Sequence, residues 1–270
     1  MKMQSKKKQQ YDEPTMTVDE LSKALYESNT KLANNIREQK DFFYNISHDL
    51  RSPIAAIRGA IEYLESDNSI DDKKRTEMYS LIDAKSKSLE FMIEEIFLLT
   101  KLGTNEKLLK PAVVPCGNYL EDYFFTNELD PKYKDLNLFL DVPMEFEWGI
   151  YVDTNYMNRV LDNLFENARR HTAKGGSITL SAKLSDDNSS AVIEVRDTGE
   201  GIEQNDIARV FDKSFMSDAS RTPGSESGAG LGLSICKRIV ELSNGTISCT
   251  SSTGEDHGTA FTIMLPVCQS

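Results

Sequence analysis

The sequence predicts an α plus α/β fold in which long helices come first and a mixed region of strands and helices follows. Apolar residues recur every three or four positions between residues 19 and 102, which is typical of helices that bury one face. From about Lys110 to Pro266, short alternating stretches typical of strands are separated by helical stretches. A chain of 270 residues is long enough for two modest domains.

The first part is expected to be a helical hairpin. One helix is predicted over residues 19–66 and a second from about Asp72 to Leu102, with the polar loop Ser66–Ser69 between them. Their apolar stripes are Phe43, Ile46, Leu50, Ile54, Ile57, Ile61 and Leu64 in the first helix, and Met78, Ile82, Leu89, Met92, Ile96 and Leu99 in the second. Two antiparallel helices cannot bury such stripes alone, so we expect a homodimer that forms a four-helix bundle.

His48 lies off the stripe of the first helix and is predicted to face solvent. Asp49 follows it, Ser52 lies one turn on, and Pro53 stands inside the helix. An imidazole that is near neutral at physiological pH keeps a lone pair on one nitrogen, which a nucleophile toward phosphorus needs. The alternative is an incidental surface histidine.

Two asparagines stand on one face of a later helix, which is predicted from Thr154 to Thr172. Asn163 and Asn167 are four residues apart and therefore stack, with Arg170 nearby. The amide oxygen is a hard, neutral ligand suited to Mg²⁺, so this face could hold a metal-bound polyphosphate. The alternative is a pair of capping or core-edge amides.

A strand predicted over residues 191–196 ends in the sequence Asp-x-Gly-x-Gly. Asp197 opens this turn, and Gly199 and Gly201 allow it to be tight. A buried carboxylate there can accept a hydrogen bond from an exocyclic amine such as adenine N6. The alternative is a plain hairpin turn.

A polar segment without periodicity, residues 212–227, separates this turn from a glycine-rich stretch over residues 228–233. Loops of such length inside a compact domain are usually lids or disordered. The glycine-rich stretch opens a helix predicted to run to Ser243, whose first N–H groups suit phosphate. Its spacing is Gly-x-Gly-x-Gly and no strand precedes it, which argues against a dinucleotide fingerprint.

The order and spacing of these motifs, over Asp19 to Pro266, resemble the sensor histidine kinases of two-component signalling. The matching segments are the phosphoacceptor box His48–Pro53, the N box Asn163–Thr172, the first glycine box Asp197–Ile202 and the second glycine box Gly228–Leu233, followed by Gly258–Phe261. The chain departs from the family pattern at Ser214, where a Phe is common, at Ser52, where Thr or Asn is usual, and at His171, where Tyr is frequent.

The resemblance implies a dimeric antiparallel helical hairpin followed by an α/β sandwich that binds ATP beside a lid. The domains expected are an N-terminal tail with a HAMP-like signalling helix (1–40), dimerisation and phosphotransfer helices (41–103) and a catalytic ATP-binding domain (110–268). Gly103–Asn105 is the expected linker.

The resemblance also implies the chemistry. ATP and Mg²⁺ would bind the second domain, and the γ-phosphate would pass to His48 and then to an aspartate of a cognate response regulator. Asp49 would hold the Nδ1 proton as a general base, and Ser52 would place a water for phosphatase activity on the regulator.

Sixteen residues are expected to contact the nucleotide. Asn167 would bind Mg²⁺, Asp197 would read adenine and Arg170 would neutralise phosphate charge. The others expected are Asn163, His171, Gly199, Gly201, Ile202, Phe211, Lys213, Gly228, Gly230, Leu231, Gly232, Leu233 and Thr259.

Two other function classes compete with a kinase. One is an ATPase or ATP-driven clamp similar to gyrase and MutL, which carry a water-activating Glu where this chain has Asn163. The other is a non-catalytic dimeric signalling scaffold, against which the intact motifs speak.

Composition limits the partners and the location. A net charge of −12 argues against nucleic acid as a partner. The four cysteines fit neither a zinc site nor a redox pair and suggest a reducing compartment. No run of about 18 apolar residues is present. The lead helix resembles half of a HAMP module, so we expect the cytoplasmic portion of a cell-membrane receptor whose sensor lies outside this chain. The alternative is an ordinary kinase with a short coiled-coil lead.

Overall fold

The computed structural model describes residues 17–66, 70–104, 108–143, 148–213 and 230–268. The chain separates into two compact units, residues 1–44 and 45–270. In the first unit, the described residues form the first turns of a long helix. In the second, a helical hairpin precedes a mixed sheet with helices, so the predicted α plus α/β fold is confirmed.

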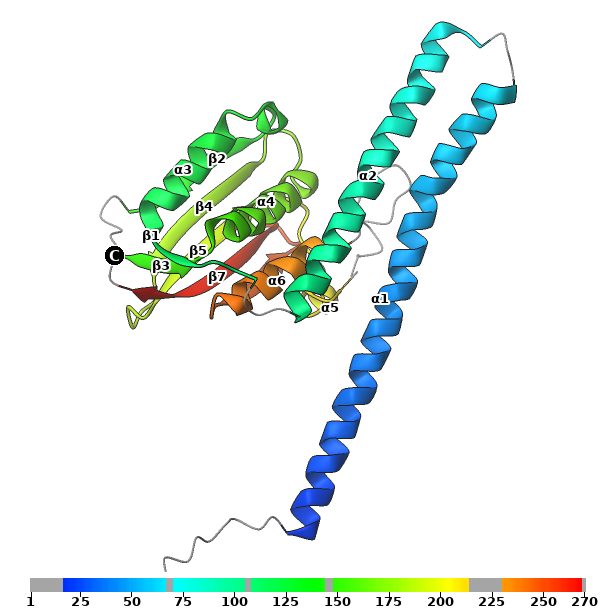
Figure 1. The fold of residues 1–270 in the computed structure, drawn as a ribbon. Coiled ribbons are helices and arrows are strands. Elements are labelled where there is room, and N and C mark those ends of the chain that lie inside the picture. Colours follow the sequence, from blue (N-terminus) through cyan, green and yellow to red (C-terminus); the bar gives the residue numbers. More distant parts are fainter. Residues whose placement is uncertain (1–16, 67–69, 105–107, 144–147, 214–229, 269–270) are drawn as a thin grey trace, which may run out of the picture. The chain divides into compact units, whose positions relative to one another are not determined.

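The hairpin consists of helix α1 (Val18–Ser66) and helix α2 (Asp72–Thr104) (Figure 1). Thr17 and Glu20 start α1 with a reciprocal capping box: the Glu20 amide donates to Thr17 Oγ1 (3.3 Å) and the Thr17 amide donates to Glu20 Oε2 (2.8 Å). Pro53 is tolerated inside α1. Both bounds agree with the predicted helices. Gly103 and Thr104 of the expected linker still belong to α2, while Asn105 lies outside the described residues.

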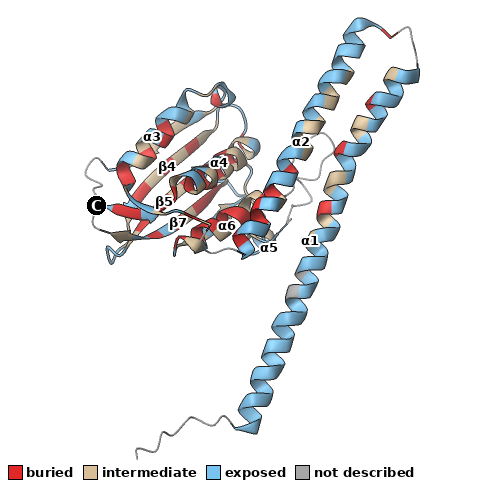
Figure 2. Ribbon diagram, viewed as in Figure 1, coloured by how far each residue is buried: buried red, intermediate tan, exposed pale blue. Residues whose placement is uncertain are grey.

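The apolar stripe of α1 is only partly buried. Ile46, Pro53 and Ala60 are buried, but Ile54 and Ile61 are 54% and 42% exposed. Phe43, in the first unit, is also exposed. This partial exposure agrees with the expectation that two antiparallel helices cannot bury the stripe alone, because one partner helix covers only a narrow strip of α1. The stripe predicted for α2 is buried or half-buried, and most of the hairpin surface is exposed (Figure 2).

The second domain is built on one mixed sheet. Its strands are β1 (Ala112–Pro115), β2 (Asn137–Asp141), β3 (Gly149–Val152), β4 (Ser177–Leu184), β5 (Ser190–Asp197), β6 (Thr246–Ser252) and β7 (Gly258–Cys268). The strand order is β1-β3-β7-β5-β4-β2, and β6 pairs with β7. The β2–β4 pair is parallel and the other pairs are antiparallel.

Three helices cover one face of this sheet: α3 (Cys116–Glu128), α4 (Thr154–His171) and α6 (Gly232–Leu242) (Figure 1). Alternate residues of β4 and β5 point to the helices and are buried, while their neighbours face outward. The core between the layers is nearly sealed, and it includes Leu161, Leu164, Phe165, Ile178, Leu180, Ile193, Ile235 and Ile263. This arrangement fixes α4 and the end of β5 as rigid supports for the functional residues.

Some elements were not predicted. The strands β1 and β3 have four residues each, too short for an alternating pattern to appear, and α3, the 3₁₀ turn Pro131–Tyr133 and the short helix α5 (Gln204–Ile207) were also missed. The alternating pattern predicts five strands, over residues 136–142, 177–183, 191–196, 246–251 and 259–265, and each is present within three residues of its expected ends. None of the described helices is both long enough and apolar enough to cross a membrane.

Helix α2 contacts the second domain near its C-terminal end. Glu95, which is 2% exposed, forms an ion pair with Arg159 of α4. Arg238 of α6 donates from Nε to the Leu102 carbonyl oxygen over 3.1 Å. Leu102 is fully buried. The last turns of the hairpin are therefore part of the packing that supports α4 and α6.

Candidate functional site

His48 is displayed on α1, as its sequence position predicted. Its side chain is 72% exposed, and its Nδ1 lies 3.4 Å from Asp49 Oδ1. A carboxylate at this position can accept a hydrogen bond from Nδ1–H, and the tautomer that donates this bond carries its lone pair on Nε2. The geometry suits a nucleophile, whereas a histidine that stabilised the fold would be packed.

Ser52 lies one turn after His48 and is exposed. Mid-helix Ser and Thr side chains often bond the carbonyl one turn back, as Thr76 does with the Asp72 carbonyl (2.8 Å). Among the described residues, Ser52 has no such bond. Its hydroxyl is therefore available to groups outside the helix.

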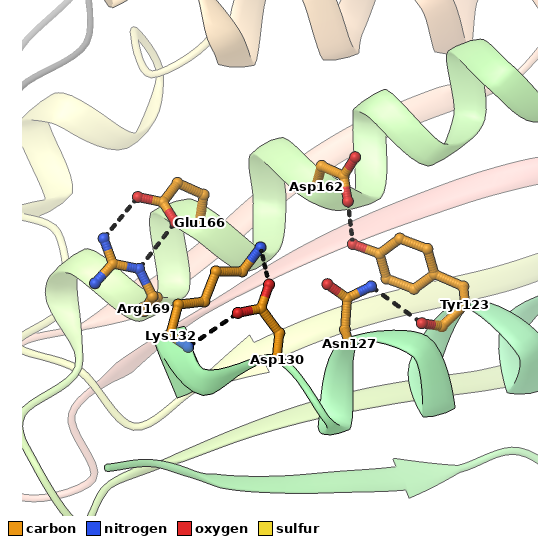
Figure 3. A network of polar contacts seen from close by, with 7 residues as sticks. All are labelled: Tyr123, Asn127, Asp130, Lys132, Asp162, Glu166 and Arg169. Atoms are coloured by element: carbon orange, nitrogen blue, oxygen red, sulfur yellow. Dashed lines mark hydrogen bonds and ion pairs between the residues drawn. The ribbon is translucent and has the colours of Figure 1, made fainter. Parts of the chain in front are cut away.

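Polar contacts surround the 3₁₀ turn and α3, and one of them reaches α4 through Asp162 (Figure 3). The Tyr123 hydroxyl of α3 donates to Asp162 Oδ1 (2.9 Å), and burial raises the pKa of Tyr123. Nearby, Asp130 accepts from the Lys132 amide and pairs with its Nζ, which fixes the 3₁₀ turn. Residue 163 lies about 100° around the helix from residue 162. The network therefore sets the rotation of α4 and the direction of the next face.

Glu166 holds two arginines of α4. Its carboxylate accepts from Arg169 Nε (2.9 Å) and from Arg170 Nε (2.8 Å). Burial alone would raise the pKa of Glu166, but these two guanidinium groups outweigh it and hold the pKa below the ordinary value. The Arg170 side chain is thus placed beside Asn167 with a fixed direction.

The two asparagines of α4 differ in whether they are available for a ligand. Asn167 is half-buried and makes no hydrogen bond with the described residues. Asn163 Nδ2 is buried, and the interaction of this amide with the Cys236 thiol opposes the rise that burial gives to the pKa of that thiol. A Cβ at Gly232 would lie 3.1 Å from Asn163 Oδ1, so the start of α6 sits directly against this amide. Of the two side chains, the half-buried Asn167 amide is therefore the one open to a ligand.

Asp197 lies at the end of β5 and is 4% exposed. Its Oδ1 accepts from the Gly199 amide (2.8 Å) and the Thr259 amide (3.2 Å). Burial raises the pKa of Asp197, and these two bonds act in the opposite direction. Both described bonds reach Oδ1, which leaves Oδ2 as an acceptor for an amine.

The glycines of the Asp197 turn are required by close backbone contacts. A Cβ at Gly199 would lie 2.4 Å from the His171 carbonyl oxygen. At Gly201 it would lie 2.0 Å from the Ser252 carbonyl oxygen, and Gly201 has φ +78°. The predicted tight turn is confirmed, and both positions exclude a side chain.

Further predicted residues gather around the same turn. His171 Nδ1 lies 2.8 Å from Glu200 Oε1, and the Ile202 amide donates to Ser251 Oγ (2.8 Å). The Ser251 hydroxyl also lies 2.9 Å from Thr259 Oγ1. The structure therefore brings His171, Ile202 and Thr259 together beside Asp197.

The second glycine box is described in part. Gly230 has φ +64°, Leu231 is buried, and α6 begins at Gly232 without a side-chain cap. Among the described residues its first amides have no acceptor, and such amides suit an anion. Phe211 packs edge-on against Phe261, with ring centroids 6.1 Å apart, and Lys213 is exposed. Gly228, Ser214 and most of the expected lid lie outside the described residues.

These groups have the composition of a nucleotide site. The described residues contain no group of three or more His, Cys, Asp and Glu that could hold a metal alone. Mg²⁺ commonly takes one or two protein oxygens and completes its shell with phosphate and water, and the free Asn167 amide fits that role. Sequence reasoning missed His257, whose Nδ1 lies 2.6 Å from the Gly199 carbonyl oxygen, because no periodic or motif signal marks a single loop histidine.

Comparisons with known proteins agree with this site. The family model of histidine kinase-, DNA gyrase B- and HSP90-like ATPases matches residues 152–269, and that of the His Kinase A phospho-acceptor domain matches residues 38–105. The sensor protein SrrB of Staphylococcus aureus (strain NCTC 8325 / PS 47) is 31% identical over 229 residues. The match covers 84% of this chain but spans only 38% of SrrB.

Solved structures share the fold. A complex of the histidine kinase ThkA with the response regulator protein TrrA has a TM-score of 0.68 at 19% identity, over 90% of this chain and 66% of that one. Full-length ShkA in complex with AMPPNP has a TM-score of 0.60 at 23% identity, over 83% of this chain and 45% of that one. At these identities the likeness confirms a helical hairpin followed by a mixed α/β domain.

Proposed function

This chain belongs to the sensor histidine kinases, and on that premise we propose that it transfers the γ-phosphate of ATP to His48. One combination of features carries the proposal. An exposed His48 lies beside Asp49, and the second domain holds the buried carboxylate of Asp197 together with the Asn167 amide, which has no partner among the described residues. A scaffold would need neither.

ATP binding is supported by the chemistry of the turn and of α4. Asp197 Oδ2 would accept from the adenine amino group, and Arg170 with the first amides of α6 would face the phosphates. Asn167 would hold Mg²⁺, which supplies neutralisation of phosphate charge. The bound analogue in the ShkA structure is a property of that protein and supports the same use here.

The transfer step requires a free lone pair on His48. Nε2 would attack the γ-phosphorus and form the P–N bond, while the bond to the β,γ-bridging oxygen breaks and ADP leaves with the electron pair. Asp49 would accept a hydrogen bond from Nδ1–H throughout, which keeps the lone pair on Nε2. Such transfers depend mainly on positioning and charge neutralisation.

The expected partners are a second copy of the chain and a response regulator. The exposed apolar residues of the hairpin support a dimer, and the ThkA–TrrA complex supports a regulator as the acceptor of the phosphoryl group. We further propose that residues 19–40 act as a HAMP-like relay that couples the kinase to a membrane sensor, so that these domains lie in the cytoplasm. The domain bounds 1–40, 41–103 and 110–268 stay predictions.

A labelling assay tests the proposal. Wild type incubated with γ-labelled ATP and Mg²⁺ should acquire label that is lost in acid and kept in alkali. His48→Gln should lose the label and keep its ATP affinity by calorimetry, whereas Asn167→Ala should lose Mg²⁺-dependent binding. Phosphate release without any labelled protein would instead favour the ATPase class.

Ser52 supports a phosphatase activity. Its exposed hydroxyl, one turn from His48, could hold a water that attacks a regulator's phospho-aspartate. Phosphate release from the phosphorylated regulator should be lost in Ser52→Ala and kept in Ser52→Thr. Equal rates in the wild type and both variants would remove this role from Ser52.

A further inference from the structure

We propose that His257 is a positioning residue for the adenine-binding turn, and that together with His171 it clamps the Gly199–Glu200 peptide. The proposal rests on the proposed function in one respect, because the turn is assigned to adenine through Asp197. It adds a residue outside the matched boxes.

Both polar groups of one peptide bond are held by the two histidines. The Gly199 carbonyl oxygen accepts from His257 Nδ1 over 2.6 Å, and the Glu200 amide donates to the His171 carbonyl oxygen over 3.2 Å. In a trans peptide, these two groups point in opposite directions. The peptide is therefore hydrogen-bonded on both sides, and it cannot rotate without losing both bonds.

The Glu200 side chain adds a second contact between the turn and His171. Its Oε1 lies 2.8 Å from His171 Nδ1, so Glu200 is tied to His171 through both backbone and side chain. His171 ends α4, the helix that carries Asn163 and Asn167. The clamp therefore also links the turn to the helix expected to hold the phosphates.

The clamped peptide adjoins the group that would read adenine. The Gly199 amide donates to Asp197 Oδ1, and so does the Thr259 amide, two residues after His257. Between them, Gly258 has φ +145°, and a Cβ there would lie 2.2 Å from the Asp197 carbonyl oxygen. One short segment thus contacts the turn through His257 and through Thr259, and it orients the carboxylate.

A turn with two glycines needs such support. Glycine loses more conformational freedom on ordering than other residues, so an unclamped turn would be ordered only when the ligand binds. A turn that is already ordered loses less conformational entropy when the ligand binds, so the affinity rises without an added contact to the ligand. The exposed position of His257 in the β6–β7 loop shows that its ring is not needed to fill the core.

Three variants test the clamp by calorimetry with ATP, ADP and adenosine. His257→Ala should raise all three dissociation constants by about fivefold, the worth of one hydrogen bond, while kcat at saturating ATP stays unchanged. His257→Asn should restore affinity, because its amide N–H₂ can occupy the place of Nδ1. Glu255→Ala is the matched control, since Glu255 is exposed in the same loop and makes no bond with the described residues.

Hydrogen exchange of the nucleotide-free protein gives a second readout. The Glu200 amide should exchange several-fold faster in His257→Ala than in wild type and His257→Asn. Unchanged exchange and unchanged affinities in His257→Ala would overturn the clamp. A wild type that binds no nucleotide, with faster exchange in His257→Ala, would support the clamp and refute the assignment of the turn to adenine.

Discussion

The helical hairpin and the sheet domain both carry apolar residues at regular intervals, but their apolar side chains are buried to different degrees. In the sheet domain, Leu161, Ile193 and Ile263 are fully buried within one chain. In the hairpin, Ile54, Ile93 and Phe97 remain 54–60% exposed although they stand at apolar helix positions. The sheet domain is therefore complete as a single copy, whereas the hairpin is incomplete.

This difference shows where function can be regulated. A sealed core gives a fixed frame for the Asp197 turn and for α4, which a nucleotide site requires. In the proposed dimer, the exposed apolar residues of the hairpin would make the arrangement of α1 and α2 depend on the second copy, and a change in helix packing would then reach His48 without unfolding either domain. Four predictions test this difference in burial, beginning with the largest expected effect.

The largest effect is expected in the sealed core. Leu161→Ala removes a fully buried side chain between α4 and the sheet, and it should lower the free energy of unfolding by about 3 kcal/mol. Denaturant unfolding measures the change. Leu129→Ala, at a residue 84% exposed, should change it by less than about 0.5 kcal/mol. Similar values for both variants would mean that Leu161 is not part of a sealed core.

The ion pair where α2 contacts α4 should give the next effect. Arg159→Ala leaves the Glu95 carboxylate buried without its partner, and it should cost about 2 kcal/mol, below the range for fully buried pairs because Arg159 is partly exposed. Adding Glu95→Gln should recover part of the loss. Thermal unfolding of the two single variants and the double variant measures the coupling, and strictly additive losses would argue against the pair.

Replacing an exposed apolar residue of the hairpin should affect dimer association rather than folding. Phe97→Ala should raise the dimer dissociation constant about tenfold, because each copy loses apolar area at the interface, and leave the helix content unchanged. Sedimentation equilibrium measures the constant. Lys74→Ala, on an exposed polar position of α2, serves as the control. A Phe97→Ala protein that unfolds instead would place Phe97 in the core of the single chain.

The smallest effect is expected in the dependence of stability on pH. The arginines hold the pKa of Glu166 below its ordinary value of 4.5, so its contribution to stability is complete above that value and is lost as pH falls through the lowered pKa. Glu166→Gln should be slightly less stable than wild type at neutral pH, and the two should converge in acid. Melting temperatures over a pH series would reveal a gap that widens in acid if this reasoning is wrong.

The sequence predicted the long helices, five strands and the Asp197 turn because each has a periodic or glycine signal of sufficient length. It could not predict β1 and β3, since four residues are too few to show alternation. It also predicted that one hairpin leaves part of its apolar stripe uncovered, as Ile54 and Ile61 are, but periodicity does not show which residues of the stripe the second helix covers.

The candidate site was predicted through motifs rather than through contacts. Asp197, Gly199 and Gly201 stand where their spacing placed them, and the structure adds the reasons: backbone atoms approach too closely for any side chain. The bond from His257 to Gly199 joins residues 58 positions apart and depends on the β5–β7 register, which no local pattern encodes.

Pro53 has a consequence for the helix turn that carries His48. Proline has no amide hydrogen, so the carbonyl oxygen of Asp49, four residues earlier, lacks the bond that would close its turn of α1. That oxygen belongs to the residue that follows the exposed His48, and it needs a donor from elsewhere. A protein or nucleotide group that approaches His48 thus meets a peptide whose helix bond is already absent, and it can bond there at little cost in local order.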